Sequence, residues 1–218
     1  MTESRNIARV ILPEPTISRL PWYLACLRSQ HSRGVTRVSS TQIAKEINVD
    51  ASQIAKDLSL LNVKGKTRIG YEVAPLIAGL EEFLGFRVTH KAFMIGTGSL
   101  GRALIQDTGL AQFGLSIVAG FDINPELVGS SVGNVPIYHI DELDARQAET
   151  GTEIGILAVP AEHAQDATDN MIACGIKAIW NFTPSRIKAS GEIVIQNTSI
   201  YAHLAVMYNR LEEKRRDM

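Results

Sequence analysis

A glycine-rich segment, Gly96-Thr97-Gly98-Ser99-Leu100-Gly101, carries the clearest chemical signal in the sequence. It directly follows an apolar run, residues 92–95, and precedes a segment with helical spacing of apolar residues. Gly96 fits a tight turn, Gly98 lets the backbone approach a pyrophosphate, and Gly101 lets a helix pack closely on a strand. The segment therefore predicts a helix N-terminus that binds the phosphates of a dinucleotide.

A carboxylate completes this signal at the end of the next apolar run. Asp122 follows Gly101 by 21 residues and stands in Gly120-Phe121-Asp122. A carboxylate at this place accepts hydrogen bonds from the adenosine ribose and repels a 2′-phosphate, which favours NAD(H) over NADP(H). The alternative is a glycine turn without a ligand and an aspartate that caps a loop.

Two later segments end predicted strands and are candidates for the rest of the ligand site. They are Ala158-Val159-Pro160 and Asn181-Phe182-Thr183-Pro184. Ligands of open parallel sheets bind at the carboxyl ends of strands, although Asn181 also suits a local turn. We expect structural roles for His139, His163 and His203, because no nucleophile or carboxylate stands at a spacing that indicates catalysis. We therefore predict no catalytic residue.

Five apolar runs after Lys91 predict the strands that position these loops. Their near-continuous apolar character, and their alternation with helical segments such as 100–107 and 162–173, indicate a parallel sheet covered on both faces. Together with the glycine-rich segment, this pattern predicts a Rossmann-type, doubly wound α/β domain. The predicted strands are residues 92–95, 117–121, 154–159, 178–182 and 192–195.

The first part of the chain carries a different pattern. Residues 1–91 contain 13 lysines and arginines against 8 aspartates and glutamates, whereas the remaining residues contain 9 against 15. A basic first part suggests a module that meets a polyanion, and a solvated charged face is the alternative. Apolar residues at helical spacing predict helices over 16–30, over 41–47 and up to Leu61, and a basic hairpin follows at 64–71. This order is typical of a winged helix-turn-helix domain.

In such a domain the third helix lies in the major groove and the wing lies near the DNA backbone. Ser52, Gln53 and Lys56 share the polar side of the predicted third helix. Glutamine can pair with adenine, and lysine can reach guanine or phosphate. The alternative is a plain helical bundle with a solvated polar face. The candidates on the wing, which would neutralise phosphates, are Lys64, Lys66 and Arg68.

The bulk composition limits the class of protein. The chain has 218 residues, of which 45% are apolar, and it has two cysteines, Cys26 and Cys174. Two distant cysteines without partners at metal-ligand spacing predict a reducing compartment and no metal site. No signal peptide or membrane span is evident, so we expect a cytoplasmic protein. We predict a winged-helix domain at 1–85, a Rossmann domain at 86–199 and a C-terminal dimerisation helix at 200–218.

The two halves together resemble the redox-sensing transcriptional repressor family called Rex, from about Ile17 to Leu204. The segments that carry the resemblance are spread in order along both halves. They are Arg19-Leu20-Pro21, Val38-Ser39-Ser40, Lys56-Asp57-Leu58-Ser59, Gly70-Tyr71, residues 96–104, Phe121-Asp122, Ala158-Val159-Pro160-Ala161-Glu162, Gly175-Ile176-Lys177 and Asn181-Phe182-Thr183-Pro184.

The resemblance implies a homodimer whose C-terminal helix, from Ile200 onward, is exchanged between subunits. Members of the family bind a palindromic operator in double-stranded DNA when NADH is scarce and release it when NADH rises, while NAD+ competes. On this basis we expect a repressor that senses NADH and NAD+. We expect Ser39 and Ser40 among the residues at the DNA.

The sequence departs from the family at positions that matter for switching. An arginine of the first helix is replaced by Ala25, a tyrosine after the glycine-loop helix by Asp107, and an aspartate before the last helix by Ser199. In the family these three groups form a switch across the domain and subunit boundary. The arginine before Lys56 is also replaced, by Ala55.

Three functions therefore stay open. The first is a repressor released by NADH. The second is a relative that binds DNA but has lost or altered redox switching, which the replaced residues favour. The third is an NAD-dependent oxidoreductase, which would need a proton-transfer residue and a substrate domain, and the N-terminal head of about 90 residues leaves little chain for one.

Overall fold

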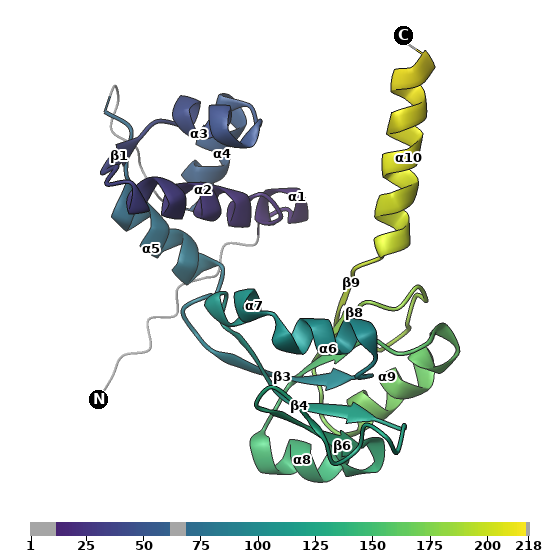
Figure 1. Ribbon diagram of the computed structural model, residues 1–218. Coiled ribbons are helices and arrows are strands. Elements are labelled where there is room, and N and C mark those ends of the chain that lie inside the picture. Colours follow the sequence, from purple (N-terminus) through teal and green to yellow (C-terminus); the bar gives the residue numbers. More distant parts are fainter. Residues whose placement is uncertain (1–11, 62–68, 217–218) are drawn as a thin grey trace, which may run out of the picture. The chain divides into compact units, whose positions relative to one another are not determined.

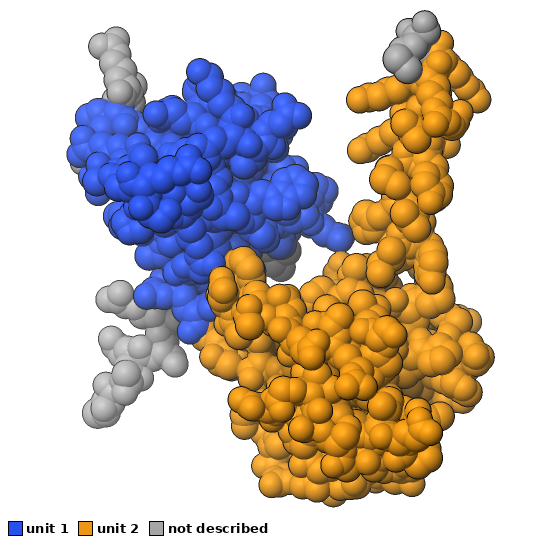
Figure 2. All heavy atoms as spheres, in the orientation of Figure 1, with its two compact units in different colours: residues 1–87 blue, residues 88–218 orange. Residues whose placement is uncertain are grey.

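The structure is a computed structural model that describes residues 12–61 and 69–216. The chain divides into two compact units, residues 1–87 and residues 88–218, which Figure 2 colours blue and orange. This boundary lies two residues after the predicted end of the first domain at residue 85, and the C-terminal helix is counted with the second unit.

The first unit consists of helices with a short two-stranded antiparallel sheet (Figure 1). The sheet pairs Arg37 with Glu72 and Val38 with Tyr71. This is the predicted winged helix-turn-helix arrangement, and the fold class is confirmed. The elements are α1 (Glu14–Ile17), α2 (Leu20–Ser32), β1 (Arg37–Val38), α3 (Ser40–Ile47), α4 (Ala51–Leu60), β2 (Tyr71–Glu72) and α5 (Val73–Phe83).

Local sequence explains where the helices of the first unit begin. Pro21 lies in the first turn of α2, where its missing N–H costs no hydrogen bond. Ser39 and Gln42 form a capping box at the start of α3, and the Asp50 carboxylate accepts the N–H groups that begin α4. Asn48 adopts the left-handed conformation that separates the two helices.

The helices of the first unit pack around one apolar core. Helices α2, α4 and α5 each contribute apolar residues at helical spacing, and the stripe of α2 that the sequence predicts is fully buried. The buried side chains of this core include Leu20, Tyr23, Leu24, Leu27, Ile43, Ile54, Leu58, Leu76 and Leu80.

The second unit is built on a seven-stranded sheet in the order β5-β6-β4-β3-β7-β8-β9. All neighbouring strands are parallel except the pair β5 and β6. The reversal of strand order beside β3 is the arrangement of a doubly wound, Rossmann-type sheet, as predicted. The strands are β3 (His90–Ile95), β4 (Leu115–Asp122), β5 (Ser131–Val132), β6 (Val135–His139), β7 (Ile154–Leu157), β8 (Ala178–Asn181) and β9 (Val194–Asn197).

Helices join these strands and cover the sheet. One face packs on α8 and α9 through Leu143 and Met171, and the opposite face packs on α6 through Leu104 and Ile105. On that second face, Trp180 and Phe182 are only half-buried. The helices are α6 (Ser99–Gln106), α7 (Thr108–Gln112), α8 (Leu143–Thr150), α9 (Ala164–Ala173) and α10 (Ile200–Arg216), with short 3-10 turns η1 (Ile140–Glu142) and η2 (Ala161–His163).

The last helix, α10, is the yellow helix that follows β9 in Figure 1. None of its described residues is buried, although its sequence contains several large apolar side chains. Among the residues that the structure describes, no helix is long and apolar enough to cross a membrane. The exposed apolar residues of α10 are Ile200, Tyr201, Val206, Met207, Tyr208 and Leu211.

Candidate functional site

The glycine-rich segment forms the turn between β3 and α6, as predicted. Gly96 has a φ of 88°, and a Cβ there would lie 2.6 Å from the carbonyl oxygen of Ala158. A Cβ on Gly101 would lie 2.1 Å from the carbonyl oxygen of Gly96. Both positions therefore exclude a side chain, the first because of backbone conformation and packing and the second because of packing alone.

Gly98 differs, because a Cβ at this position would meet no atom of the described protein within 4 Å. Gly98 is also the N-cap of α6 and offers no side chain to the free N–H groups of the first helical turn. The N-terminus of α6 therefore presents unpaired donors and a positive dipole at an open surface, which is the arrangement that binds phosphate groups.

Asp122 lies beside this turn, at the end of β4. Its Oδ2 accepts the backbone N–H of Thr97 at 2.7 Å and the Thr97 hydroxyl at 2.9 Å, and its Oδ1 accepts the N–H of Asn124 at 3.0 Å. Burial would raise the pKa of the Asp122 carboxyl, but the donated N–H groups outweigh burial and hold that pKa below its usual range. A carboxylate is thus fixed in its charged form next to the glycine-rich turn.

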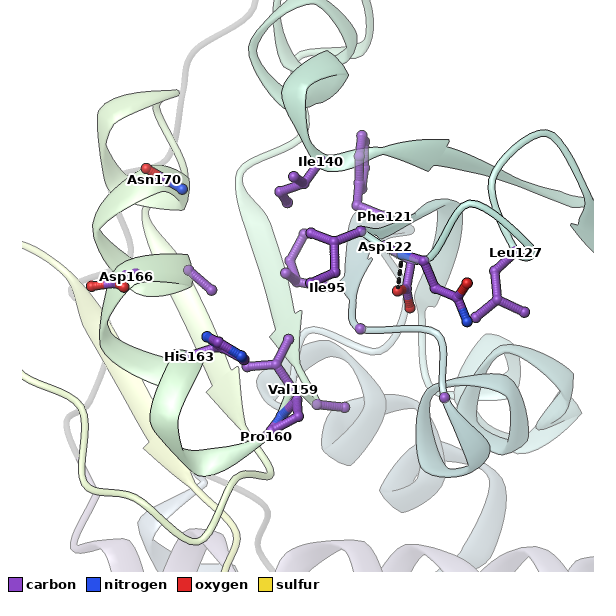
Figure 3. Close-up of a pocket in the computed structure, with 16 residues that line it drawn as sticks. Ile95, Phe121, Asp122, Leu127, Ile140, Val159, Pro160, His163, Asp166 and Asn170 are labelled. Carbon is purple, nitrogen blue, oxygen red and sulfur yellow. Dashed lines mark hydrogen bonds between the residues drawn. The ribbon is translucent and has the colours of Figure 1, made fainter.

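A cavity of about 400 Å³ opens at the carboxyl ends of β3, β4 and β7 (Figure 3). Figure 3 shows Asp122 and Leu127 on one side of the cavity and His163, Asp166 and Asn170 on the other. Its walls are mostly apolar. The lining residues are Ile95, Gly96, Gly98, Phe121, Asp122, Ile123, Asn124, Leu127, Ile140, Ala158, Val159, Pro160, His163, Asp166, Ala167 and Asn170.

The structure brings five of the predicted ligand residues together around this cavity, namely Gly96, Gly98, Asp122, Val159 and Pro160. Thr97 turns its hydroxyl to Asp122 instead, and Ser99, Leu100 and Gly101 form the first turn of α6.

The segment after β8 lies outside the lining of this cavity. The buried side chain of Asn181 donates to Ser185 O and to Asn197 Oδ1, and its Oδ1 accepts the N–H and hydroxyl of Thr183. Asn181 therefore fixes the local turn, the alternative that the sequence left open. Phe182 packs on Trp180 with ring centroids 4.6 Å apart, and Pro184 is exposed.

Sequence reasoning missed the contribution of α9 to the cavity. His163, Ala167 and Asn170 lie four and then three residues apart, a spacing that puts them on one helical face. That spacing is visible in the sequence, but nothing in the sequence shows that this face meets a cavity rather than the core or solvent.

In the first unit, α4 presents the residues predicted to meet DNA. Ser52 and Lys56 are exposed, and the Ser52 hydroxyl donates to Asp50 at 2.5 Å. Gln53 is half-buried, and its side-chain N–H donates to Asp57 at 2.8 Å. The exposed residues of α4 are therefore Ser52, Lys56, Ser59 and Leu60, while Gln53 is held by its hydrogen bond to Asp57.

Asp57 is the centre of a polar network that sequence reasoning did not assign. Its carboxylate is 1% exposed and accepts two hydrogen bonds from Arg19, at 2.8 and 2.9 Å, and one from the Tyr23 hydroxyl at 2.8 Å. Burial would raise the pKa of Asp57, but the hydrogen bonds from Arg19, Tyr23 and Gln53 hold that pKa below its usual range. The same burial, with Asp57 close by, raises the pKa of Tyr23 to about 12.

The remaining predicted DNA contacts divide into two groups. Ser39 caps α3 and Ser40 begins it, and both are half-buried. The wing residues Lys64, Lys66 and Arg68 lie outside the described residues.

The structure describes all three positions at which the sequence departs from the family's switch residues. Ala25 is exposed on α2. The Asp107 carboxylate accepts the N–H of Gly109 at 2.9 Å and caps α7, and the Ser199 hydroxyl accepts the N–H of Ala202 at 3.1 Å at the start of α10. Asp107 and Ser199 thus act as caps of the helices that follow them.

The described residues contain no group of three or more histidine, cysteine or acidic side chains that could hold a metal ion. Cys26 and Cys174 are both free thiols. Burial, followed by the hydrogen bond from its thiol to Glu46, raises the pKa of Cys26 to about 12, so this thiol is protonated and unreactive near neutral pH.

Comparison with known families assigns a description to each half of the chain. Residues 88–185 match the family described as "CoA binding domain", and residues 11–59 match the family described as "Putative DNA-binding protein N-terminus".

Named relatives cover nearly the whole chain. The redox-sensing transcriptional repressor Rex of Bacteroides fragilis is 60% identical over 200 residues, which are 92% of this chain and 91% of the relative. Rex of Porphyromonas gingivalis is 53% identical over 201 residues, which are 92% of each chain.

Two solved structures are also similar to this chain over nearly its whole length. A crystal structure of RSP in complex with β-NAD+ and operator DNA superposes with a TM-score of 0.88 at 33% identity and covers 94% of both chains. A crystal structure of RSP with β-NADH has a TM-score of 0.84 at the same identity and covers 94% of this chain and 96% of that one.

Proposed function

The chain belongs to the Rex family of redox-sensing transcriptional repressors, and we propose that it binds operator DNA through its first unit and leaves the DNA when NADH binds its second unit. The observation that carries this proposal is the open N-terminus of α6 beside the ionised Asp122. The helix N-terminus and the carboxylate together fit a dinucleotide whose adenosine ribose has an unphosphorylated 2′-hydroxyl and is joined to a pyrophosphate.

Different residues of the cavity would bind different parts of the dinucleotide. The N–H groups of the first turn of α6 would hold the pyrophosphate, and Gly98 leaves room for it. The Asp122 carboxylate accepts three hydrogen bonds and, with about four lone-pair sites, retains one for a ribose hydroxyl. A 2′-phosphate would meet its negative charge, which favours NADH and NAD+ over their phosphorylated forms.

In this proposal the winged-helix domain, which is the first unit, binds the DNA. Insertion of α4 into the major groove would bring Ser52 and Lys56 to base edges or phosphates, with Gln53 beside them. The basic residues predicted on the wing would add contacts to the backbone. Ser39 and Ser40, at the start of α3, would meet the phosphates that flank the groove.

The proposed assembly is a homodimer. The exposed apolar side chains of α10 need a partner, and the half-buried Trp180 and Phe182 form an apolar surface on the α6 face of the sheet. Exchange of α10 between two copies would cover both surfaces and set two winged helices on a palindromic operator.

Release of DNA requires that NADH bind the arrangement unable to hold DNA more tightly than the arrangement that holds it. The named relatives are transcriptional repressors, which supports a regulatory rather than a catalytic role for the dinucleotide. Because a repressor works where its operator lies, we propose a cytoplasmic location.

A fluorescence anisotropy titration tests this function. The labelled DNAs are the sequence upstream of the gene and a panel of palindromic operators. Each is titrated with the protein at fixed salt, first without nucleotide, then with NAD+ and then with NADH. Tight binding that NADH alone abolishes is the expected result. Binding that neither nucleotide changes would contradict the redox switch, and binding to none of the DNAs would contradict the repressor itself.

One observation favours a second candidate, a DNA-binding relative with lost or altered redox switching. The family's switch positions hold Ala25, Asp107 and Ser199, and the last two side chains act as helix caps. If NADH leaves DNA affinity unchanged, restoring arginine, tyrosine and aspartate at these positions should create the response. A triple variant that still ignores NADH would contradict this second candidate.

A further inference from the structure

The face of α9 that meets the cavity carries hydrogen-bonding side chains along its length, namely His163, Asp166 and Asn170. His163 stands at the start of the helix, beside the turn at Val159 and Pro160, and Asn170 stands two turns later. Seven residues of α-helix span about 10 Å, so Asn170 lies about that far along the helix from His163. Figure 3 shows Asn170 on α9, across the cavity from Asp122.

The covalent structure of a dinucleotide determines which of its groups would lie near Asn170. Asp122 is tied to Thr97 of the phosphate-binding turn and would hold the ribose, so the base attached to that ribose extends into the remaining cavity. The walls there are the apolar side chains of Ile123, Leu127 and Ile140, which suit the flat faces of an aromatic ring. A ring that lies with one face on these side chains can turn its edge toward α9.

Asn170 is equipped to read that edge. Its side chain makes no hydrogen bond within the described part of the chain, so both its carbonyl and its N–H₂ are available. An asparagine amide matches the N7 edge of adenine in two bonds, because its carbonyl oxygen accepts from the 6-amino group and its N–H₂ donates to N7. A 6-oxopurine presents acceptors at both O6 and N7, so the amide carbonyl loses its donor and one of the two bonds.

We propose that Asn170 is a specificity-determining residue that selects a 6-aminopurine over a 6-oxopurine in the nucleotide bound by this chain. The inference rests on the proposed function, which puts a dinucleotide in this cavity. It adds that the repressor recognises the base through α9 as well as the phosphates and ribose.

The test compares two ligands that differ only in the base, namely NADH and reduced nicotinamide hypoxanthine dinucleotide. Binding is followed by the fluorescence of the reduced nicotinamide, which both ligands share. The wild-type protein should bind NADH about tenfold more tightly, as expected for loss of one of two bonds at an exposed amide. Asn170→Leu should reduce this preference to about twofold or less, mainly by weakening NADH.

A matched variant on the same helix controls for changes in α9. Asp169 is exposed, lies outside the cavity lining and, among the described residues, accepts a hydrogen bond only from Gln165, so Asp169→Ala should keep the preference. Thermal unfolding of both variants shows whether the fold is intact. Equal binding of the two ligands by the wild type, or an unchanged preference in a folded Asn170→Leu variant, would overturn the inference while the proposed function stands. Failure of the wild type to bind either ligand would overturn both.

Discussion

Three glycines in one turn serve three different physical needs. Gly96 has a left-handed backbone and touches the strand at Ala158, Gly101 touches the backbone of Gly96, and Gly98 faces open space. The first two are therefore required by the fold itself, whereas the fold alone does not require a glycine at the third position. The glycine spacing predicts the tight turn and the close packing, because both depend on local backbone geometry, whereas the contact of Gly96 with Ala158 depends on tertiary packing. The role of Gly98 toward a pyrophosphate stays a prediction.

This difference gives a prediction at the residue scale. Gly98→Ala should leave stability almost unchanged, because its φ of −65° suits alanine and its Cβ meets no atom of the protein. The added methyl should still reduce NADH affinity by about tenfold or more, a loss of about 1.4 kcal/mol, because it occupies the approach of the pyrophosphate. Calorimetric titration and thermal unfolding measure the two effects.

Gly101→Ala provides the contrast. Its Cβ would lie 2.1 Å from a backbone oxygen, so we expect a loss of stability of about 1–3 kcal/mol. Gly191→Ala, which meets no atom and needs no positive φ, should change neither property. A Gly98→Ala protein that binds NADH like the wild type would show that the phosphates lie elsewhere.

The hydrogen-bond partners of two residues could not be predicted from the sequence. Asn181 ends a strand at the edge where ligands bind, but three of its hydrogen bonds go to the turn that follows it and the fourth goes to Asn197 on the neighbouring strand β9. Asp57 lies beside a predicted DNA contact, yet its partners Arg19 and Tyr23 are more than 30 residues away in sequence. Such partners depend on tertiary packing, which spacing along the chain does not reveal.

At the scale of elements, Asp57 joins α4 to the helices before it. Its carboxylate on α4 binds Arg19 at the start of α2, Tyr23 within α2, and Thr16 of α1. Gln53, one turn earlier on α4, donates to the same carboxylate. The network therefore fixes the orientation of α4, the helix proposed to read DNA, against the core of the first unit.

This network predicts a stability that depends on pH. Because the folded pKa of Asp57 is depressed, its contribution is present above the unfolded pKa of about 3.9 and is lost as the pH falls through the folded pKa. Asp57→Asn should therefore destabilise the protein by about 2–3 kcal/mol near neutral pH, and the difference from the wild type should shrink in acid. Urea denaturation over a pH series measures this difference.

A surface pair of the same unit serves as the control for that series. Arg87 and Glu82 lie 4.0 Å apart and are both exposed, so Glu82→Gln should cost less than about 0.5 kcal/mol at any pH. A destabilisation by Asp57→Asn that stays constant down to strongly acid pH would contradict the role assigned to the charged carboxylate.

Elements with strong local patterns were predictable, and short or polar ones were not. The strands β3, β4 and β7 are apolar runs, and the helix α2 has a clear apolar stripe, so their sequences indicate them directly. The strand β5 has two residues, β6 contains Pro136, and α7 spans five residues. α8 exposes most of its surface, and only Leu143 is buried. None of these four was predicted, because their stability comes from packing on the sheet rather than from their own pattern.

At the scale of the whole molecule, α10 is an element that its own chain leaves uncovered. Its exposed apolar residues and the half-buried Trp180 and Phe182 together predict a dimer. Met207→Glu with Leu211→Glu places two charges in the proposed interface, and we expect the protein to shift from dimer to monomer. Light scattering after size-exclusion chromatography measures the mass.

Glu213→Ala is the matched control, because it changes an exposed charged residue of the same helix and should leave the dimer intact. The monomeric variant should also bind a palindromic operator more weakly, since two linked winged helices share one binding event. A double-glutamate variant that remains dimeric would contradict the role assigned to α10.

The central claim is that dinucleotide and operator bind at coupled sites, and calorimetric titration of NADH tests it most directly. NADH is titrated into the free protein and into the protein saturated with operator DNA. Coupling is reciprocal, so NADH should bind the DNA complex about 5- to 150-fold more weakly, which corresponds to about 1–3 kcal/mol. NADH that binds the free protein and the DNA complex with equal affinity would contradict the redox switch.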